Sequence, residues 1–275
     1  MAKHGGKLLI DALDELWRKY RKRLKACRQT ANEDNVHELR VSTRRLLALI
    51  ELLQALQPQP ALRRIRKTLK NQLDGFDELR DTQVMLFEIA KTMPALPELE
   101  PFLAHLHRRE QQLLAESQSL VAGLYQPKLR RKIVKIGNRF KARTADTDLH
   151  AALLAAIDKV YADTINRYQV IDPRDLASIH HLRIAVKKLR YLLISVQAII
   201  TDLPEDHSKH LQRYLTRMGD IQNATVLLQT LEIFFLAAVP PAIKEYYQKQ
   251  QQALIDEFML HREEIFGFWR ESDSV

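Results

Sequence analysis

Two segments of this chain place one histidine and three further basic residues at the same spacing. In the first segment these residues are His37, Arg40, Arg44 and Arg45, and in the second they are His180, Arg183, Lys187 and Lys188. Arginine can donate two parallel hydrogen bonds to phosphate oxygens, lysine supplies a point charge, and histidine can donate while neutral or add charge when protonated. Core packing alone would preserve only the apolar positions, so the repeated basic positions predict one extended anion contacted by both halves.

Helical spacing places most of these groups on one face of each segment. At about 3.6 residues per turn, the histidine, the arginine and the next basic residue share one stripe, while Arg45 and Lys188 lie on its flank. Like charges at this spacing destabilise an isolated helix by about 0.2–0.5 kcal/mol per pair. A solvated basic face is the alternative for either copy, and each histidine has the alternative of fixing helix packing. Arg190 extends the second segment, where the first has Leu47.

Two further basic stripes recur at matching places in the two halves. Arg63, Arg66 and Lys70 follow an i, i+3, i+7 pattern, and Lys209, Arg213 and Arg217 follow an i, i+4, i+8 pattern. Both patterns keep their members on one face of a helix, so these six residues join the candidate anion-binding site, with exposure to water as the alternative. The acid-free run from Arg18 to Arg28 is instead expected to face mostly water, around an apolar stripe that explains its helix.

The elements around these residues are duplicated as well. Residues 73–84 align with residues 215–226, and prolines interrupt both halves at corresponding places. Proline ends helices because it lacks an N–H and clashes with the preceding turn. The duplication predicts a first helical repeat at residues 1–122, a basic linker with the option of a short helix of its own at 123–147, and a second helical repeat at 148–275.

Composition and periodicity predict an all-α protein. The chain has 275 residues, only seven glycines and 7% aromatic residues, which does not fit a β-rich fold. Leu, Ala, Gln, Arg, Lys and Glu are abundant and favour helices. The expected helices span residues 6–28, 32–57, 60–92, 97–122, 148–170, 174–201, 205–238 and 241–270, with boundaries good to a few residues.

The doubled motif resembles a known family. Two copies of a His-x-Leu-Arg-x-x-x-basic-basic helix, each followed by a segment of the type Leu-(Gly)-x-x-Arg-Asp-x-x-Val, are similar to the CHAD family (conserved histidine α-helical domain), and the resemblance covers nearly the whole chain. It implies two four-helix bundles related by a pseudo-twofold axis, a basic groove or pore between them, and binding of inorganic polyphosphate. The sequence departs from the pattern where Asn223 aligns with Asp81 and Gly219 with Asp77.

Bulk properties point to the same class of partner. The formal net charge is +9, which favours a polyanion such as polyphosphate, with nucleic acid as the alternative. The single cysteine, Cys27, excludes an internal disulfide and a cysteine-based zinc site, as in a reducing compartment. The start of the chain has no secretory pattern, and no apolar run reaches the roughly 20 residues of a membrane span. A cytoplasmic protein is therefore expected, associated with polyphosphate granules and not with membranes, in an oligomeric state that the sequence does not predict.

No catalytic pattern accompanies the basic motifs. The sequence lacks a glycine-rich phosphate loop, a GxSxG elbow, an HExxH motif and the Glu-x-Glu-x-Lys signature of the CYTH domain that often accompanies CHAD. We therefore expect a binding protein with no catalytic residues, no cofactor and no metal site. The alternatives are a metal-dependent polyphosphate or phosphate-ester hydrolase that uses acids such as Asp74, Asp77, Asp81 and Asp220, and an RNA-binding helical protein.

Overall fold

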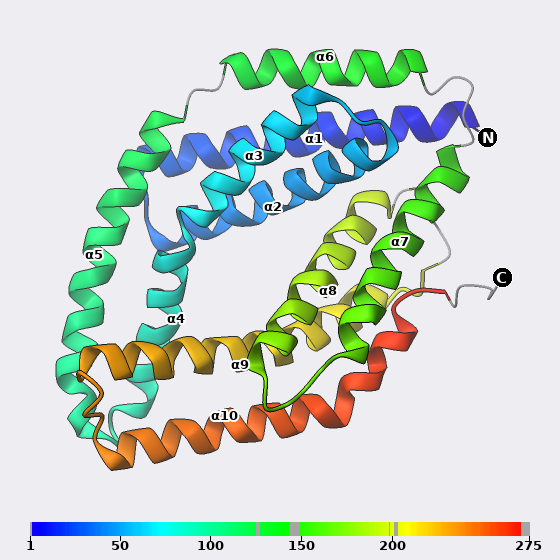
Figure 1. Cartoon of the computed structure of the whole chain (residues 1–275). Coiled ribbons are helices and arrows are strands. Elements are labelled where there is room, and N and C mark those ends of the chain that lie inside the picture. The colour runs from blue at the N-terminus through cyan, green and yellow to red at the C-terminus, as the bar shows by residue number, and fades with distance from the viewer. Residues whose placement is uncertain (1, 125–126, 144–148, 198, 201–202, 271–275) are drawn as a thin grey trace. The chain divides into compact units, whose positions relative to one another are not determined.

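The structure is a computed structural model, and it describes residues 2–124, 127–143, 149–197, 199–200 and 203–270. In these residues the regular secondary structure is entirely helical, which confirms the all-α prediction (Figure 1). The α-helices are α1 (Ala2–Gln29), α2 (Glu33–Leu56), α3 (Pro60–Asp74), α4 (Asp77–Thr92), α5 (Glu100–Gly123), α6 (Pro127–Arg143), α7 (Leu149–Gln169), α8 (Leu176–Val196), α9 (His207–Phe234) and α10 (Pro241–His261). Two 3₁₀ helices, η1 (Pro97–Leu99) and η2 (Arg262–Gly267), flank α5 and α10.

The chain divides by its contacts into two compact units. The first unit comprises Met1–Phe76, Ala115–Asp163 and Lys188–Glu205, and the second comprises Asp77–Leu114, Thr164–Lys187 and Asp206–Val275. Each unit thus takes segments from both of the repeats expected at 1–122 and 148–275. The arrangement as two duplicated four-helix bundles stays a prediction.

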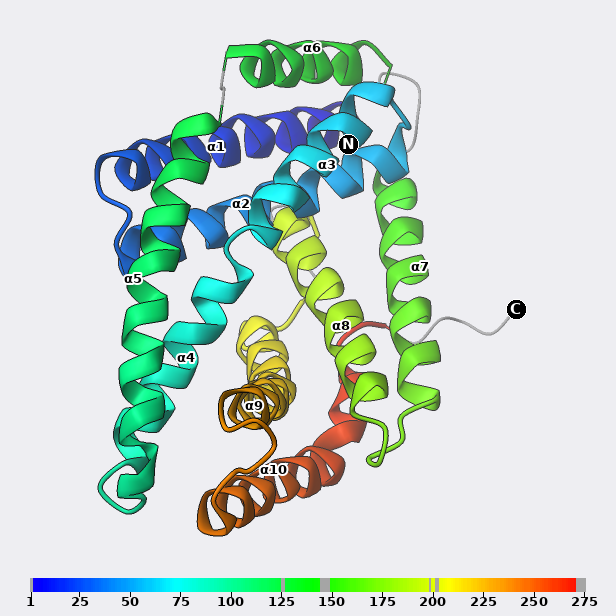
Figure 2. The ribbon, with the colours of Figure 1, turned by 60° about the vertical axis from the view of Figure 1, so that its left-hand side comes forward.

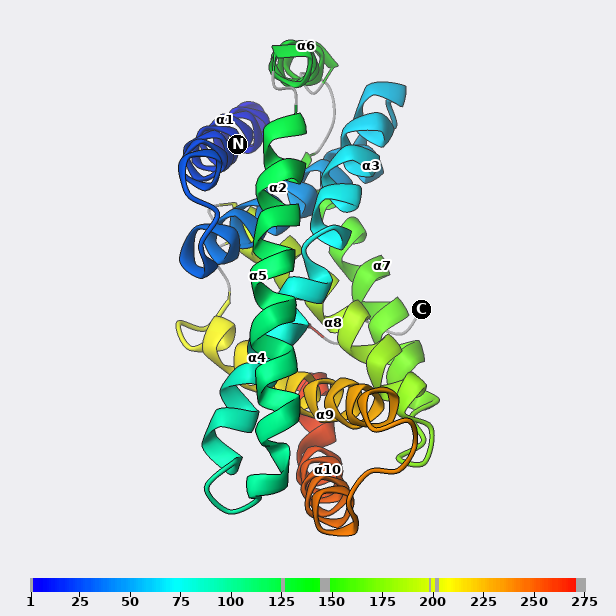
Figure 3. The same cartoon turned by 90° about the vertical axis from the view of Figure 1, so that its left-hand side faces the viewer.

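In the first unit, α1 packs along α2, α2 along α3, and α6 against both α1 and α3 (Figures 2 and 3). The buried side of α1 is an apolar stripe at helical spacing, formed by Leu9, Leu13, Tyr20, Leu24 and Cys27. Asn32 caps the start of α2 by accepting a hydrogen bond from the Asn35 N–H at 3.0 Å. These features fix the position of the helix that carries the first basic row.

The segment expected as a basic linker contains helix α6. Its buried side chains are Ile133, Ile136 and Phe140, and a β-carbon at Gly137 would lie 3.6 Å from the side chain of Ile10 on α1. The helix therefore packs on the first unit through one apolar side. Residues 125–126 and 144–148 of the expected linker lie outside the described residues.

The prediction of one helix over 60–92 is wrong, because α3 ends at Asp74 and α4 begins at Asp77. At the break, a β-carbon on Gly75 would come within 2.8 Å of the Leu120 side chain on α5. Glycine therefore lets α5 approach the end of α3 closely. In the second half the aligned residue is Arg217, and α9 continues through it without interruption.

The second unit has its own core. Helix α9 packs along α10 and also contacts α4. The buried residues of this core are Met85, Leu86, Ile89, Leu99, Phe102, Leu106, Leu227, Leu231, Ile243 and Tyr247. This core holds α9, which contacts the second basic row through residues 219–222.

Burial makes Cys27 chemically inert in the folded protein. Its side chain has no exposed surface, and burial raises the pKa of its thiol to about 11. Since the thiolate is the reactive form, only about 0.1% of a group with this pKa is reactive at pH 8. We expect the native protein to resist a thiol reagent such as Ellman's reagent and to react with one equivalent after denaturation. Rapid labelling of the native protein would contradict this account.

Candidate anion-binding site

The first basic row lies on α2 and is built around a buried arginine. Arg40 is only 4% exposed, and its Nη1 donates to the Leu73 carbonyl at the end of α3, at 3.3 Å. That carbonyl belongs to the last turn of α3, where a cation interacts favourably with the helix dipole. Arg44 is half-buried, whereas His37 and Arg45 are exposed. Arg40 is therefore the buried member of the row, and the other three residues form its accessible surface.

The second basic row lies on α8 and is held against α9. The Nδ1 of His180 lies 2.6 Å from the side-chain oxygen of Gln222. Because this oxygen is an acceptor, Nδ1 donates the hydrogen bond, and Nε2 is left for other interactions. Arg183 lies over Gly219, where a β-carbon would be 3.6 Å from Nη2 and 3.7 Å from Nε. The guanidinium thus lies close to the backbone of α9, at a distance where a β-carbon would make an ordinary van der Waals contact. Lys187 is half-buried, and Lys188 is exposed.

Asp220 lies in the electrostatic field of the second row. Burial raises the pKa of its carboxyl, and the negative charges of Glu257 and Glu88 raise it further, while the positive charge of Arg183 opposes them. The surroundings therefore disfavour the charged carboxylate relative to the neutral acid, even with Arg183 nearby.

Replacing Asp220 with Asn should raise the melting temperature at pH 7. The folded-state pKa lies above the unfolded value of about 3.9, so ionisation of Asp220 disfavours the folded state at neutral pH. This penalty is absent once the pH falls below the unfolded value, so the gain from Asp220→Asn should shrink between pH 7 and pH 4. Thermal melts across this range measure the difference. A lower melting temperature at pH 7 would mean that the pairing with Arg183 outweighs the penalty.

Arg190 continues α8 beyond the second row and belongs to the first compact unit. Its guanidinium carbon lies 5.5 Å from the centroid of the Tyr191 ring, within the range of a cation–π contact. The side chain is half-buried, and its Nε finds no hydrogen-bond partner within the described part of the chain.

Three of the six residues on the two further basic stripes form ion pairs with acidic side chains. Arg66 pairs with Glu51 at 2.6 Å on α2, and Lys209 pairs with Asp206 at 2.9 Å. Arg217 donates to both carboxylate oxygens of Glu264, at 2.9 and 3.0 Å, and its Nε lies 3.8 Å from Glu257. The other three, Arg63, Lys70 and Arg213, are exposed. The exposed members retain more surface for a ligand than Arg217 does.

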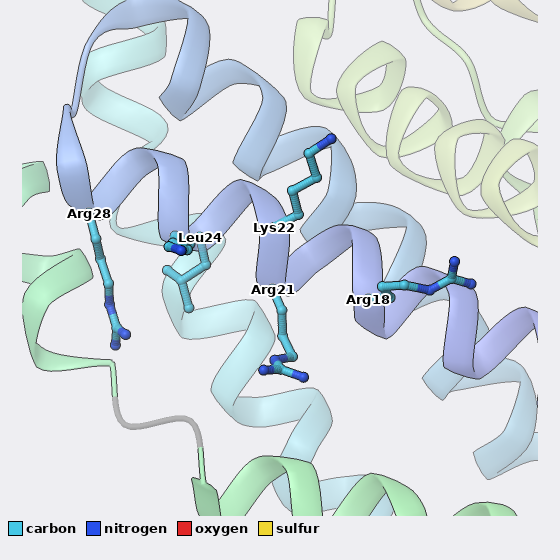
Figure 4. A pocket seen from close by; sticks show the side chains of 6 residues that line it. Arg18, Arg21, Lys22, Leu24 and Arg28 are labelled. Carbon is cyan, nitrogen blue, oxygen red and sulfur yellow. The ribbon is translucent and has the colours of Figure 1, made fainter.

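The basic run on α1, which the sequence predicts to face mostly water, also lines a pocket. Arg18, Arg21, Lys22, Leu24, Lys25 and Arg28 line a hollow of about 500 Å³ (Figure 4). The available signal was the absence of any acid between Arg18 and Arg28.

The row on α2 belongs to the first compact unit, whereas His180, Arg183 and Lys187 belong to the second and Lys188 to the first. The single cavity expected for the two rows stays a prediction. Across the described residues, no three side chains of His, Cys, Asp or Glu are grouped so that they could hold a metal ion. None of the helices in the same residues is both long enough and apolar enough to cross a membrane.

Comparisons with known proteins agree with this architecture. The fold is similar to that in the crystal structure of the CHAD domain from the plant Ricinus communis, with a TM-score of 0.64, 19% sequence identity, and coverage of 96% of this chain and 90% of that one. At this identity the likeness establishes the fold alone. No curated protein matches the sequence. The sequence profile of the CHAD domain matches residues 11–232, well over half of the chain, and the protein therefore belongs to the CHAD domain family.

Proposed function

We propose that this protein binds inorganic polyphosphate through the basic rows of α2 and α8. The observation that carries the proposal is that each row combines accessible cations with an arginine packed against a neighbouring helix. Arg40 is buried and donates to the end of α3, and the guanidinium of Arg183 lies beside Gly219 of α9. Such packing positions the helix face that carries the accessible cations, and cations that are already positioned lose little entropy on binding a charged polymer.

The geometry of one row suits a ligand with a charge on every monomer. Residues three and four apart on a helix lie about 5–6 Å from each other, so neighbouring cations of a row can contact different phosphates. Arg183 and Lys187 have this spacing on α8 and are half-buried, and the exposed Arg45 and Lys188 lie on the flanks of the two rows. The guanidinium groups donate two parallel bonds to phosphate oxygens, while the ammonium groups act as point charges.

His180 has a role that follows from its tautomer. Because its Nδ1 donates to Gln222, a neutral ring presents Nε2 as an acceptor, and only the protonated ring presents an N–H there. The protonated form therefore adds both a donor and a charge to the row of Arg183 and Lys187. The exposed His37 adds a positive charge to the row on α2 when it is protonated.

Both rows are proposed to engage one polymer. Once one row holds part of the chain, the second binding event occurs at a high effective concentration, so long chains gain affinity without new contacts. We further propose binding without hydrolysis, in the cytoplasm and at granules where polyphosphate accumulates.

A titration of long-chain polyphosphate, tripolyphosphate, orthophosphate and a structured RNA tests this function. Long chains should bind at least 100-fold more tightly than orthophosphate and should displace the RNA, and the affinity should fall log-linearly with salt as counterions are released. No phosphate should be released on incubation with divalent metal ions. Equal affinities for orthophosphate and long chains, or preferential retention of the RNA, would contradict the proposal.

A further inference from the structure

Five of the six described residues that line the hollow on α1 are basic, and we refer to this hollow as the α1 pocket. Arg18, Arg21, Lys25 and Arg28 follow each other at i, i+3, i+7 and i+10, so they form one stripe of the helix, and Lys22 borders it. The buried Leu24 also lines the hollow. All six lining residues belong to the first compact unit. The stripe is not needed to bury α1, because a separate apolar side does that.

One end of the pocket is rigid. The Nε of Arg28 donates to the Val121 carbonyl of α5 at 3.1 Å, and its Nη2 donates to the Leu124 carbonyl. The side chain of Gln118 joins the same helices, because its oxygen accepts from the Ala31 N–H and its nitrogen donates to the Arg28 carbonyl. In Figure 4 the side chains of Arg21 and Arg28 extend to the same side of α1. Arg28 therefore caps the end of α5, and these hydrogen bonds hold its guanidinium at this end of the hollow.

The stripe has few acidic neighbours. Glu15 pairs with Lys19 at 2.6 Å, although the charge of Arg18 also acts on Glu15, and Arg23 pairs with Glu38 away from the stripe. Among the described residues, no ion pair joins an acid to Arg18, Arg21, Lys22 or Lys25. Helix α6, which packs along α1, contains no acidic residue and adds exposed basic residues, including Arg130, Arg131 and Lys135. A cluster of cations without close ion pairs attracts a multivalent anion.

The volume and the lining residues of the pocket indicate which class of anion it can bind. A volume of about 500 Å³ lies within the range of small-molecule sites and exceeds what a single phosphate group needs. No aromatic side chain is among the described lining residues, so a nucleobase has no ring to stack on. We propose that the α1 pocket is a second anion-binding site, independent of the rows on α2 and α8, that takes a compact molecule with several phosphate groups, of the tripolyphosphate class.

Tripolyphosphate and a pair of charge-reversed variants test the α1 pocket. The pocket variant carries Arg21→Glu and Lys25→Glu, and the matched control carries Lys244→Glu and Lys249→Glu at exposed positions of α10. Calorimetric titration of the full chain should give at least tenfold weaker tripolyphosphate binding at the pocket for the first variant and wild-type binding for the control. Far-UV circular dichroism and the melting temperature establish that both variants are folded.

Lysine acetylation read by mass spectrometry locates the bound anion. In the wild type, tripolyphosphate should protect Lys22 and Lys25 from acetylation and leave Lys244 unprotected. A row variant, with Arg44, Arg45, Lys187 and Lys188 replaced by Ala, should keep this protection, so a failure of the rows and a failure of the pocket are distinguishable. Absence of protection, an unchanged affinity in the pocket variant, or an equal loss in the control would each overturn the second site.

Discussion

The row variant, in which Arg44, Arg45, Lys187 and Lys188 are all replaced by Ala, should bind long-chain polyphosphate at least 100-fold more weakly than the wild type. All four side chains have accessible surface on the proposed binding faces, and together they supply both halves of the bridging interaction. A 100-fold loss corresponds to about 2.7 kcal/mol. The slope of log affinity against log salt should also become shallower by about 3, because up to four phosphate contacts no longer release counterions. Fluorescence titrations at several salt concentrations measure both quantities.

A control variant is needed to show that the loss of affinity does not result from the lower net charge alone. A matched control carries Ala at four exposed lysines outside the rows and the α1 pocket: Lys91, Lys159, Lys244 and Lys249. Both variants remove four positive charges from the formal net charge of +9. The control should keep its affinity within about threefold, since long-range steering is screened beyond about 8 Å at physiological salt. A control that loses as much as the row variant would refute recognition by the rows.

Arg40→Ala should lower the free energy of unfolding by about 2 kcal/mol, whereas Arg44→Ala on the same helix should change it by less than about 0.5 kcal/mol. The Arg40 side chain is buried and donates to the last turn of α3. Its removal leaves a cavity and deletes a cation from a helix C-terminus. The Leu73 carbonyl is not orphaned, because the Phe76 N–H also donates to it, which limits the loss. Urea denaturation of the two single variants measures the difference.

A conservative replacement tests the cause of this loss. Arg40→Lys keeps the charge near the end of α3 but not the guanidinium shape, so it should recover part of the stability. If Arg40→Ala were as stable as Arg44→Ala, the buried arginine would have no structural role. The candidate site would then consist of equivalent residues, as the sequence pattern alone suggests.

The helices could be predicted because their signals are local. The apolar stripe of α1 and the prolines before α3 and α10 are visible in the sequence, and the structure has helices there. The break between α3 and α4 could not be predicted in this way. It accompanies the close approach of Leu120, which is distant in sequence, and an isolated Gly75 does not identify such a neighbour.

In the candidate site, the burial and the partners of single residues could not be predicted from the sequence either. Helical spacing groups Arg40 with His37 and Arg44, but it does not reveal that the end of α3 buries Arg40. Nor does the stripe on α9 indicate that Glu264, beyond the end of α10, engages Arg217. A periodic pattern identifies which face a residue lies on, whereas its partner depends on tertiary packing. The basic run on α1 is exposed, as its pattern predicts, but the pattern does not reveal that Arg28 donates to α5 across the fold.

The buried thiol also makes the chain suitable for site-directed spectroscopy. Cys27 is the one cysteine and is shielded, so cysteines introduced at exposed positions can carry spin labels without a background signal. Asp34 on α2 and Ile184 on α8 are exposed and lie close in sequence to the two rows. Pulsed electron paramagnetic resonance on a chain labelled at these positions reports the distance between α2 and α8. If one polymer bridges the rows, adding long-chain polyphosphate should narrow that distance distribution.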